Sequence, residues 1–287
     1  MFSLGEDYSH HIRASAQTAF RFPSIADQMV HLNVGPFIVL GGLPEVHNLY
    51  NIPENPVYPL SGRNPVNDEP VTENGPYQVP AFRPERVTAF EAGYKGLLLN
   101  KLLLLDTYVF ANRYNGFRAN QLLAQNPFAD NEKRFQTTVS TDFPVMAYGW
   151  AFGLEYRVGR AALVRGNVSY NELGEIKDPP PGFSPQFNTP RFKFNLGYRN
   201  RHITRLIGFN INWRWQESFF WESPFGSAVI PAYSMVDAHI SLAIPDLQSR
   251  IKIGGSNILN NYYTTSFGSA QIGGLFYVSW TYDELLN

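Results

Sequence analysis

Ionisable side chains are scarce in this chain of 287 residues, and a set of them falls at alternate positions of strand-like segments. Charged residues make up 16% of the sequence and the net charge is −1, whereas an average soluble domain is about 25% charged. Glu91 and Asp106 form the most suggestive pair, because two carboxylates facing each other across a turn can divide acid and base roles. Ionic pairing with Lys95, Arg113 or another base explains the same carboxylates more simply, and we prefer that interpretation.

Metal-binding and other catalytic chemistry has little support in the sequence. Six histidines are present, but no two have the HxH or HxxxH spacing that suits a metal site. His239 lies two residues from Asp237, which suggests acid–base work or, more simply, a row of solvated polar side chains. The chain has no cysteine and no GxSxG, P-loop or GxGxxG motif. We therefore expect no enzyme activity, no cofactor and no metal, and the net charge gives no reason to expect nucleic-acid binding.

The element that positions these side chains is a two-faced strand, clearest in residues 207–216. Its odd positions are Ile, Phe, Ile, Trp and Trp, and its even positions are Gly, Asn, Asn, Arg and Gln. Successive side chains of a strand point to opposite faces, so one face is apolar and the other hydrated. The same alternation appears in residues 11–20, 87–96, 103–114, 150–158, 162–171, 191–199, 236–244, 250–256 and 276–283.

The polar face carries too many charges for the core of a soluble protein, because burying them would cost more than packing returns. We predict that these side chains face a wide, water-filled lumen. The candidates are Arg13, Glu91, Lys95, Asp106, Glu155, Arg165, Lys193, Arg214, Asp237, His239 and Lys252.

The apolar face is predicted to contact lipid, with aromatic side chains toward the strand ends. The candidates are Phe209, Ile211, Trp213, Trp215, Ile240, Leu242, Phe276, Val278 and Trp280.

The fold class that fits is an all-β, antiparallel transmembrane β-barrel of about ten strands. The predicted strands are roughly 9–14 residues long, close to the ~9–11 that cross a bilayer with tilt. Long and short connections alternate along the chain, as in outer-membrane barrels with short turns on one side. No run of about 18 apolar residues exists to form a membrane helix. A soluble β-sandwich or β-propeller is an alternative fold. The low content of charged residues disfavours both, and the sequence lacks the internal repeat that a propeller requires.

Long connections are expected at about residues 21–84 and 118–147, around Pro179 to Gly182, around Ser223 to Tyr233, and through Gly273. The first begins with a capped helical turn at Ser24 and otherwise reads as one very long loop, a kind that is usually functional or disordered. Its aromatic residues, accompanied by amides, are candidates for ligand contact. They are Tyr50, Tyr58, Tyr77 and Phe82.

Five short segments, taken in order, resemble the C-terminal half of the barrel in TonB-dependent outer-membrane receptors. None is specific alone, but their order and strand context cover nearly the whole chain. They are Phe20-Arg21-Phe22-Pro23-Ser24, Arg83-Pro84-Glu85 leading to Glu91-Ala92-Gly93-Tyr94-Lys95, Asn188-Thr189-Pro190, Ile230-Pro231-Ala232-Tyr233-Ser234 before Val236-Asp237-Ala238, and Gly255-Ser256-Asn257-Ile258-Leu259-Asn260 followed by Tyr262-Tyr263.

The resemblance implies a large barrel of about 22 strands that holds a plug domain. It implies TonB-dependent uptake of a scarce ligand, such as an iron chelate, a vitamin or an oligosaccharide, across the outer membrane of a Gram-negative bacterium. Residues 1–287 are then a partial barrel domain, a C-terminal fragment without the plug, the remaining strands and the N-terminal region that TonB contacts. The alternative is a small self-contained outer-membrane barrel acting as a pore, adhesin or enzyme.

Overall fold

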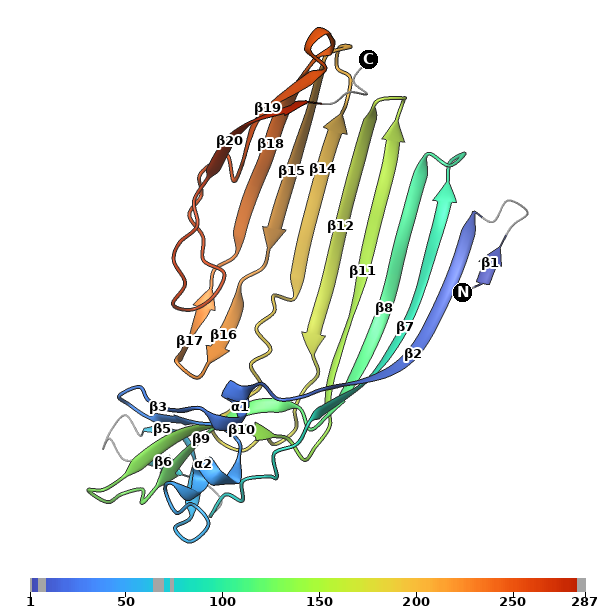
Figure 1. Ribbon diagram of the computed structural model, residues 1–287. Coiled ribbons are helices and arrows are strands. Elements are labelled where there is room, and N and C mark those ends of the chain that lie inside the picture. The colour runs from blue at the N-terminus through green and yellow to red at the C-terminus, as the bar shows by residue number, and fades with distance from the viewer. Residues whose placement is uncertain (1, 5–8, 64–69, 73–74, 283–287) are drawn as a thin grey trace.

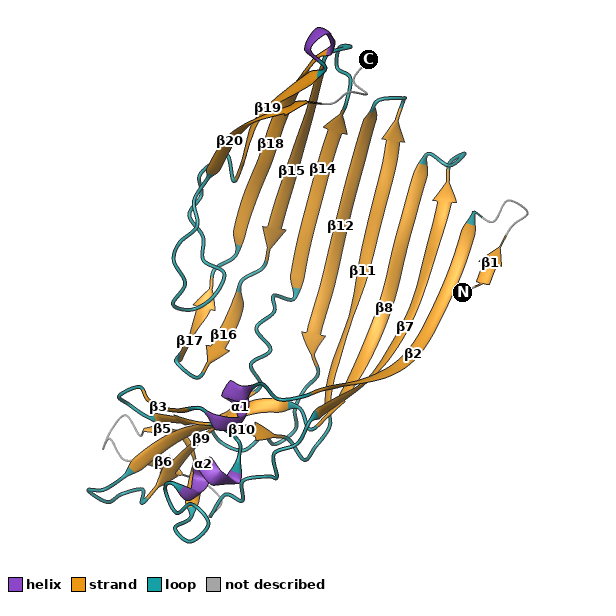
Figure 2. Ribbon diagram, viewed as in Figure 1, coloured by secondary structure: helices purple, strands orange, loops and turns teal. Residues whose placement is uncertain are grey.

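The computed structural model describes residues 2–4, 9–63, 70–72 and 75–282, and its elements are arranged as in Figure 1. Strands dominate the chain and helices are few and short (Figure 2). Among the described residues, no helix has the length and apolar character needed to cross a membrane. The alternating sequence pattern therefore determines most of the secondary structure.

The largest element is an 11-stranded sheet in which all neighbouring strands are antiparallel. The strands that the alternation predicts are present and pair antiparallel, which confirms the all-β antiparallel prediction. One short strand, β1 (Phe2–Leu4), is added at the N-terminal edge of the sheet. The others, in sheet order, are β2 (His10–Arg21), β7 (Glu85–Leu98), β8 (Leu103–Asn115), β11 (Val145–Val158), β12 (Ala162–Leu173), β14 (Phe192–Asn200), β15 (Ile207–Gln216), β18 (Tyr233–Ile244), β19 (Ser249–Ser256) and β20 (Leu275–Tyr282).

The register of this sheet keeps the two faces separate from strand to strand. Directly opposed residues share a face, and Phe209 opposes Ile240, which opposes Ile253, which opposes Val278. Ile240 is 61% exposed and Val278 is 73% exposed. No second layer of the described chain packs over this apolar row, as a soluble sandwich would require.

The sheet is curved and open. Its order runs from β1 to β20 without a return, so these two strands form its edges within the described residues (Figure 1). The architecture is that of a barrel wall, and the described residues do not close it into a barrel.

Short turns lie together at one end of the sheet and long connections at the other (Figure 1). The β7–β8 turn places Leu99, Asn100 and Lys101 at positive φ, which lets the chain reverse within a few residues. The β18–β19 turn is a 3-10 turn, η1 (Pro245–Leu247), closed by Gln248 at φ 44°. The predicted sorting of connections by side is present in the structure.

The first three long connections fold together into a second sheet of seven strands, in which β13 pairs with β9, so the prediction of one long unstructured loop over residues 21–84 is wrong. Helix α1 starts as predicted, with Ser24 in a capping box. The elements are α1 (Ile25–Met29), β3 (His31–Asn33), β4 (Ile38–Leu40), α2 (Pro44–Asn48), β5 (Val57–Arg63), β6 (Pro70–Thr72), β9 (Arg118–Gln125), β10 (Lys133–Ser140) and β13 (Phe183–Ser184). A separate hairpin pairs β16 (Phe219–Ser223) with β17 (Gly226–Ile230).

The second sheet has its own apolar core, and this is the physical reason for its order. Leu40, Val57, Leu123 and Phe135 are fully buried and pack in one cluster. They come from β4, β5, β9 and β10, which lie in two different long connections. Burying such side chains stabilises the sheet by about 1.5–3 kcal/mol each, so connections that lack order separately become ordered together.

Candidate functional site: the polar face of the large sheet

All the side chains predicted to face a lumen lie on one face of the large sheet. The ladder links them in register: Lys95 opposes Asp106, and Glu155 opposes Arg165. Asp237 opposes Asn212, which opposes Gly197, the partner of Arg165. The residues predicted to contact lipid share the opposite face. The structure therefore brings each predicted set onto a common surface, and contact with a lumen or with lipid stays a prediction.

An ionic cluster joins the first strands of the polar face. Arg13 on β2 donates from Nε to Glu91 Oε1 at 3.1 Å and from Nη1 to Asp106 Oδ1 at 3.0 Å. Lys95 Nζ lies 3.7 Å from Asp106 Oδ2. Ionic pairing of both carboxylates is thus observed, but Arg113 is not their partner, because its odd position on β8 places it on the opposite face.

A second cluster joins the last strands around Asp237. Its Oδ2 accepts from Arg214 Nη2 at 2.7 Å. Its Oδ1 accepts from Ser256 Oγ at 2.6 Å and from the backbone N–H of Asn257 at 2.9 Å. Asp237 therefore links β15, β18 and the end of β19 through one carboxylate, which gives it a structural role.

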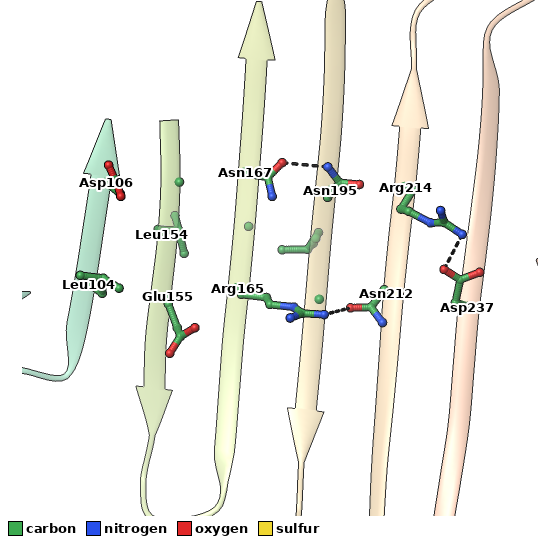
Figure 3. Close-up of a pocket in the computed structure, with 14 residues that line it drawn as sticks. Leu104, Asp106, Leu154, Glu155, Arg165, Asn167, Asn195, Asn212, Arg214 and Asp237 are labelled. Atoms are coloured by element: carbon green, nitrogen blue, oxygen red, sulfur yellow. Dashed lines mark hydrogen bonds and ion pairs between the residues drawn. The ribbon is translucent and has the colours of Figure 1, made fainter. Parts of the chain in front are cut away.

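Between the two clusters the polar face is hollowed, with a volume of about 570 Å³ (Figure 3). Amides form its floor: Asn195 Nδ2 donates to Asn167 Oδ1 at 2.8 Å, and Arg165 Nη2 donates to Asn212 Oδ1 at 3.1 Å. Amides both donate and accept, and acidic and basic side chains are mixed around them. This hollow, the amide hollow, is suited to hydrogen bonding with a neutral polar molecule or protein surface.

The amides Asn167, Asn195 and Asn212 were not among the predicted site residues. They occupy the same alternate positions as the charged candidates, so the alternation of polar and apolar residues could have identified them. They were missed because only charged or histidine side chains were taken as candidates. The remaining candidates lie at the margins of the amide hollow, Lys193 toward the long connections and His239 and Lys252 toward the short turns. No group of three or more His, Asp or Glu side chains suited to a metal occurs among the described residues.

The aromatic ligand candidates of the first long connection pack into the second sheet. The Tyr50 ring lies 4.9 Å from that of Phe135, and its hydroxyl is 2.7 Å from His31 Nε2. Burial raises the pKa of Tyr77 to about 12, with a smaller effect from Asp142. A Cβ on Gly42 would lie 2.3 Å from Phe82 Cδ2, so that ring covers the glycine.

Tyr58, on β5, is half-buried. These placements give Tyr50, Tyr77 and Phe82 a packing role, and ligand contact by any of the four stays a prediction.

Comparison with known proteins gives one consistent result. The sequence model of the family described as TonB dependent receptor-like, beta-barrel, matches residues 2–260. No curated protein matches the chain in sequence. The siderophore receptor PirA from Acinetobacter baumannii is similar in structure, with a TM-score of 0.59 and 12% identity over 95% of this chain and 39% of that one.

Two further structures are similar. P. aeruginosa FpvA bound to heterologous pyoverdines has a TM-score of 0.56 and 12% identity over 97% of this chain and 31% of that one. The FrpB iron transporter from Neisseria meningitidis has a TM-score of 0.57 and 11% identity over 96% of this chain and 38% of that one. At such identities the likeness concerns the fold, and the chain spans well under half the length of these proteins.

Proposed function

The chain belongs to the TonB-dependent receptor-like β-barrel family, and from that premise we propose that it forms part of the wall of an active importer in the outer membrane of a Gram-negative bacterium. The observation that carries the proposal is the separation of a largely apolar face from a largely polar face on one antiparallel sheet. Exposed apolar side chains such as Val278 and Trp280 cover one face, while ion pairs and amides cover the other. A lipid-facing outside and a wet inside require this arrangement.

The open edges of the sheet support a partial barrel domain over residues 1–287. Unpaired strand edges are costly in lipid, so we infer that further strands pair with β1 and β20 and that a plug domain occupies the lumen. In this proposal the polar face lines the lumen and the amide hollow contacts either the plug or the passing ligand. TonB acts through the plug side of the protein, and no step of the transport requires catalysis by this chain.

The cargo class we propose is a scarce ligand, namely an iron chelate, a vitamin or an oligosaccharide. Two of the similar structures are a siderophore receptor and an iron transporter, which favours an iron chelate among these. The long connections lie on the outward side, since outer-membrane barrels carry their short turns on the periplasmic side. The second sheet therefore stands where an incoming ligand first meets the protein.

Which face of the sheet contacts lipid is testable by cysteine labelling, because the sequence has no native cysteine. Val278→Cys and Ile240→Cys should resist a water-soluble maleimide in intact outer membranes, and Asn195→Cys and Asn212→Cys should react once the lumen is accessible in detergent. Equal labelling of both sets would refute the membrane placement.

Uptake is tested by deleting the complete gene and measuring accumulation of radioactive ferric hydroxamate, ferric catecholate, cobalamin and maltoheptaose, with and without a functional TonB. We expect one probe to lose TonB-dependent uptake. Uptake that persists without TonB, or a gene product that folds alone as a closed pore, would favour the self-contained barrel instead.

A further inference from the structure

A second hollow of the polar face lies at its short-turn end and is strongly basic. Its volume is about 460 Å³. Five cationic side chains line it, and His202 and His239 add two imidazoles. We name it the basic basin, and its cations are Arg199, Arg201, Arg205, Arg250 and Lys252.

No carboxylate compensates these charges among the described residues. The lining of the basic basin includes no Asp or Glu, and none of its five cations forms an ion pair within the described part of the chain. The acidic residue of the β18–β19 turn, Asp246, lies outside the lining. The amide hollow differs, because Asp106, Glu155 and Asp237 accompany its arginines. The excess positive charge is therefore local to the short-turn end.

The backbone holds the basin in a fixed frame. Arg199 opposes Asn210, which opposes His239, and Lys252 opposes Ser241 on the next strand pair. The turn of residues 201–206 is fastened at both ends, since Arg201 N donates to Ala161 O at 3.1 Å and Ala243 N donates to Leu206 O at 2.8 Å. Strands β14 and β19 and this turn thus present their cations toward one concave surface, to which β18 adds the imidazole of His239.

Like charges gathered on one surface repel each other and raise the energy of the unliganded protein. An anion with several charges reverses that effect, and arginine offers paired N–H donors that match carboxylate and phosphate oxygens. The volume of the basin lies within the roughly 300–1,000 Å³ typical of small-molecule sites.

We propose that the basic basin binds a small, multiply charged oxyanion bearing carboxylate or phosphate groups. This inference rests on the proposed function and deepens it: the basin lies at the periplasmic end of the lumen, where an anionic cargo leaves the barrel.

The experiment measures calorimetric binding of tripolyphosphate and citrate, with glucose as the neutral comparison, to the complete gene product in detergent. Both anions should bind and glucose should not. The variant pair Arg250→Gln and Lys252→Gln should weaken anion binding roughly tenfold, at about threefold for each exposed ionic contact.

The matched control pair is Arg157→Gln and Arg160→Gln. It removes the same charge at the same end of the sheet, from exposed residues outside the basin lining. Binding should change less than twofold in this pair. Equal weakening in both pairs, or no anion binding by the wild-type protein, would overturn the proposal.

A second double variant of the basin, Arg199→Gln with Arg205→Gln, provides the test if the Arg250→Gln/Lys252→Gln protein does not fold. It should show the same loss from the other side of the hollow, and unchanged affinity in this pair also counts against the proposal. The two proposals fail separately. Anion binding without TonB-dependent uptake would refute only the proposed transport function. TonB-dependent uptake without anion binding would refute only the proposal that the basic basin binds an anion.

Discussion

Replacing Asp237 separates the hydrogen-bonding role of its carboxylate from its charge. Oδ1 accepts from Ser256 Oγ and from the Asn257 backbone N–H, while Oδ2 alone meets Arg214. Asp237→Asn can keep an oxygen at the Oδ1 position, so it loses only the contact with Arg214. Asp237→Ala loses all three contacts. The two substitutions therefore predict different losses of stability.

The magnitudes follow from burial. Asn257 is 1% exposed, so Asp237→Ala leaves its N–H unpaired at a cost of about 1–3 kcal/mol. The Arg214 side chain is 42% exposed, and a partly solvated ion pair contributes at most about 1 kcal/mol. We expect a loss of about 2–4 kcal/mol for Asp237→Ala and about 1 kcal/mol or less for Asp237→Asn.

The assay is urea unfolding in detergent, followed by tryptophan fluorescence, together with the heat-dependent shift in gel mobility. Asp246→Ala is the control, because Asp246 lies exposed in the β18–β19 turn and its loss should change the free energy of unfolding by only about 0.5 kcal/mol. The reasoning is refuted if Asp237→Asn destabilises as much as Asp237→Ala, or if Asp237→Ala resembles the control.

Three further predictions follow from other parts of the structure. Val278→Arg should cost about 2–4 kcal/mol of stability in lipid, while Ser279→Glu on the polar face, directly opposite Lys252, should be nearly neutral or slightly stabilising; the reverse order in urea titrations in vesicles would contradict the assignment of faces. Burial lowers the pKa of His47 below its usual 6.5, so stability of the second sheet should be complete above about pH 6.5 and fall as pH drops through the lower folded pKa. His47→Gln should flatten that dependence in limited proteolysis, and an unchanged pH profile would exclude His47 as its source. A double-mutant cycle of Arg13→Gln with Asp106→Asn should give a coupling of about 0.5–1 kcal/mol that weakens with salt, because both side chains are over a quarter exposed; additive losses would show that the pair is not coupled.

Buried polar contacts of the second sheet join two of the long connections to each other. Arg118 pairs with Asp27 of α1, and its backbone N–H donates to Glu85 Oε2 at 3.1 Å. Gln125 Nε2 donates to two carbonyls, of Tyr50 and Asn55, at 3.0 and 2.9 Å. These buried polar contacts tie the first long connection to the second. We therefore expect the two connections to move as one unit.

The large sheet could be predicted because its information is local. Residues 207–216 alternate strictly, and the period of two alone assigns a strand and the face of each side chain. The short turns were also visible, since Asn100-Lys101 and Pro245-Asp246 interrupt the alternation. Neighbouring strands joined by such turns pair with each other, so most of the antiparallel order followed from the sequence.

Long-range pairing was invisible for the opposite reason. Strands β3 and β4 are only three residues each, too short for any period to show, and β4 pairs in parallel with β10 almost a hundred residues away. Arg13 pairs with Glu91 and Asp106 because the register of three strands brings these side chains together. Arg113 lies on the other face of the sheet because its position on β8 is odd and that of Asp106 is even. Alternation along one strand thus determined which side chains share a surface. Only the tertiary structure decided which of them touch, because contacts between distant segments depend on register and on the core that they bury jointly.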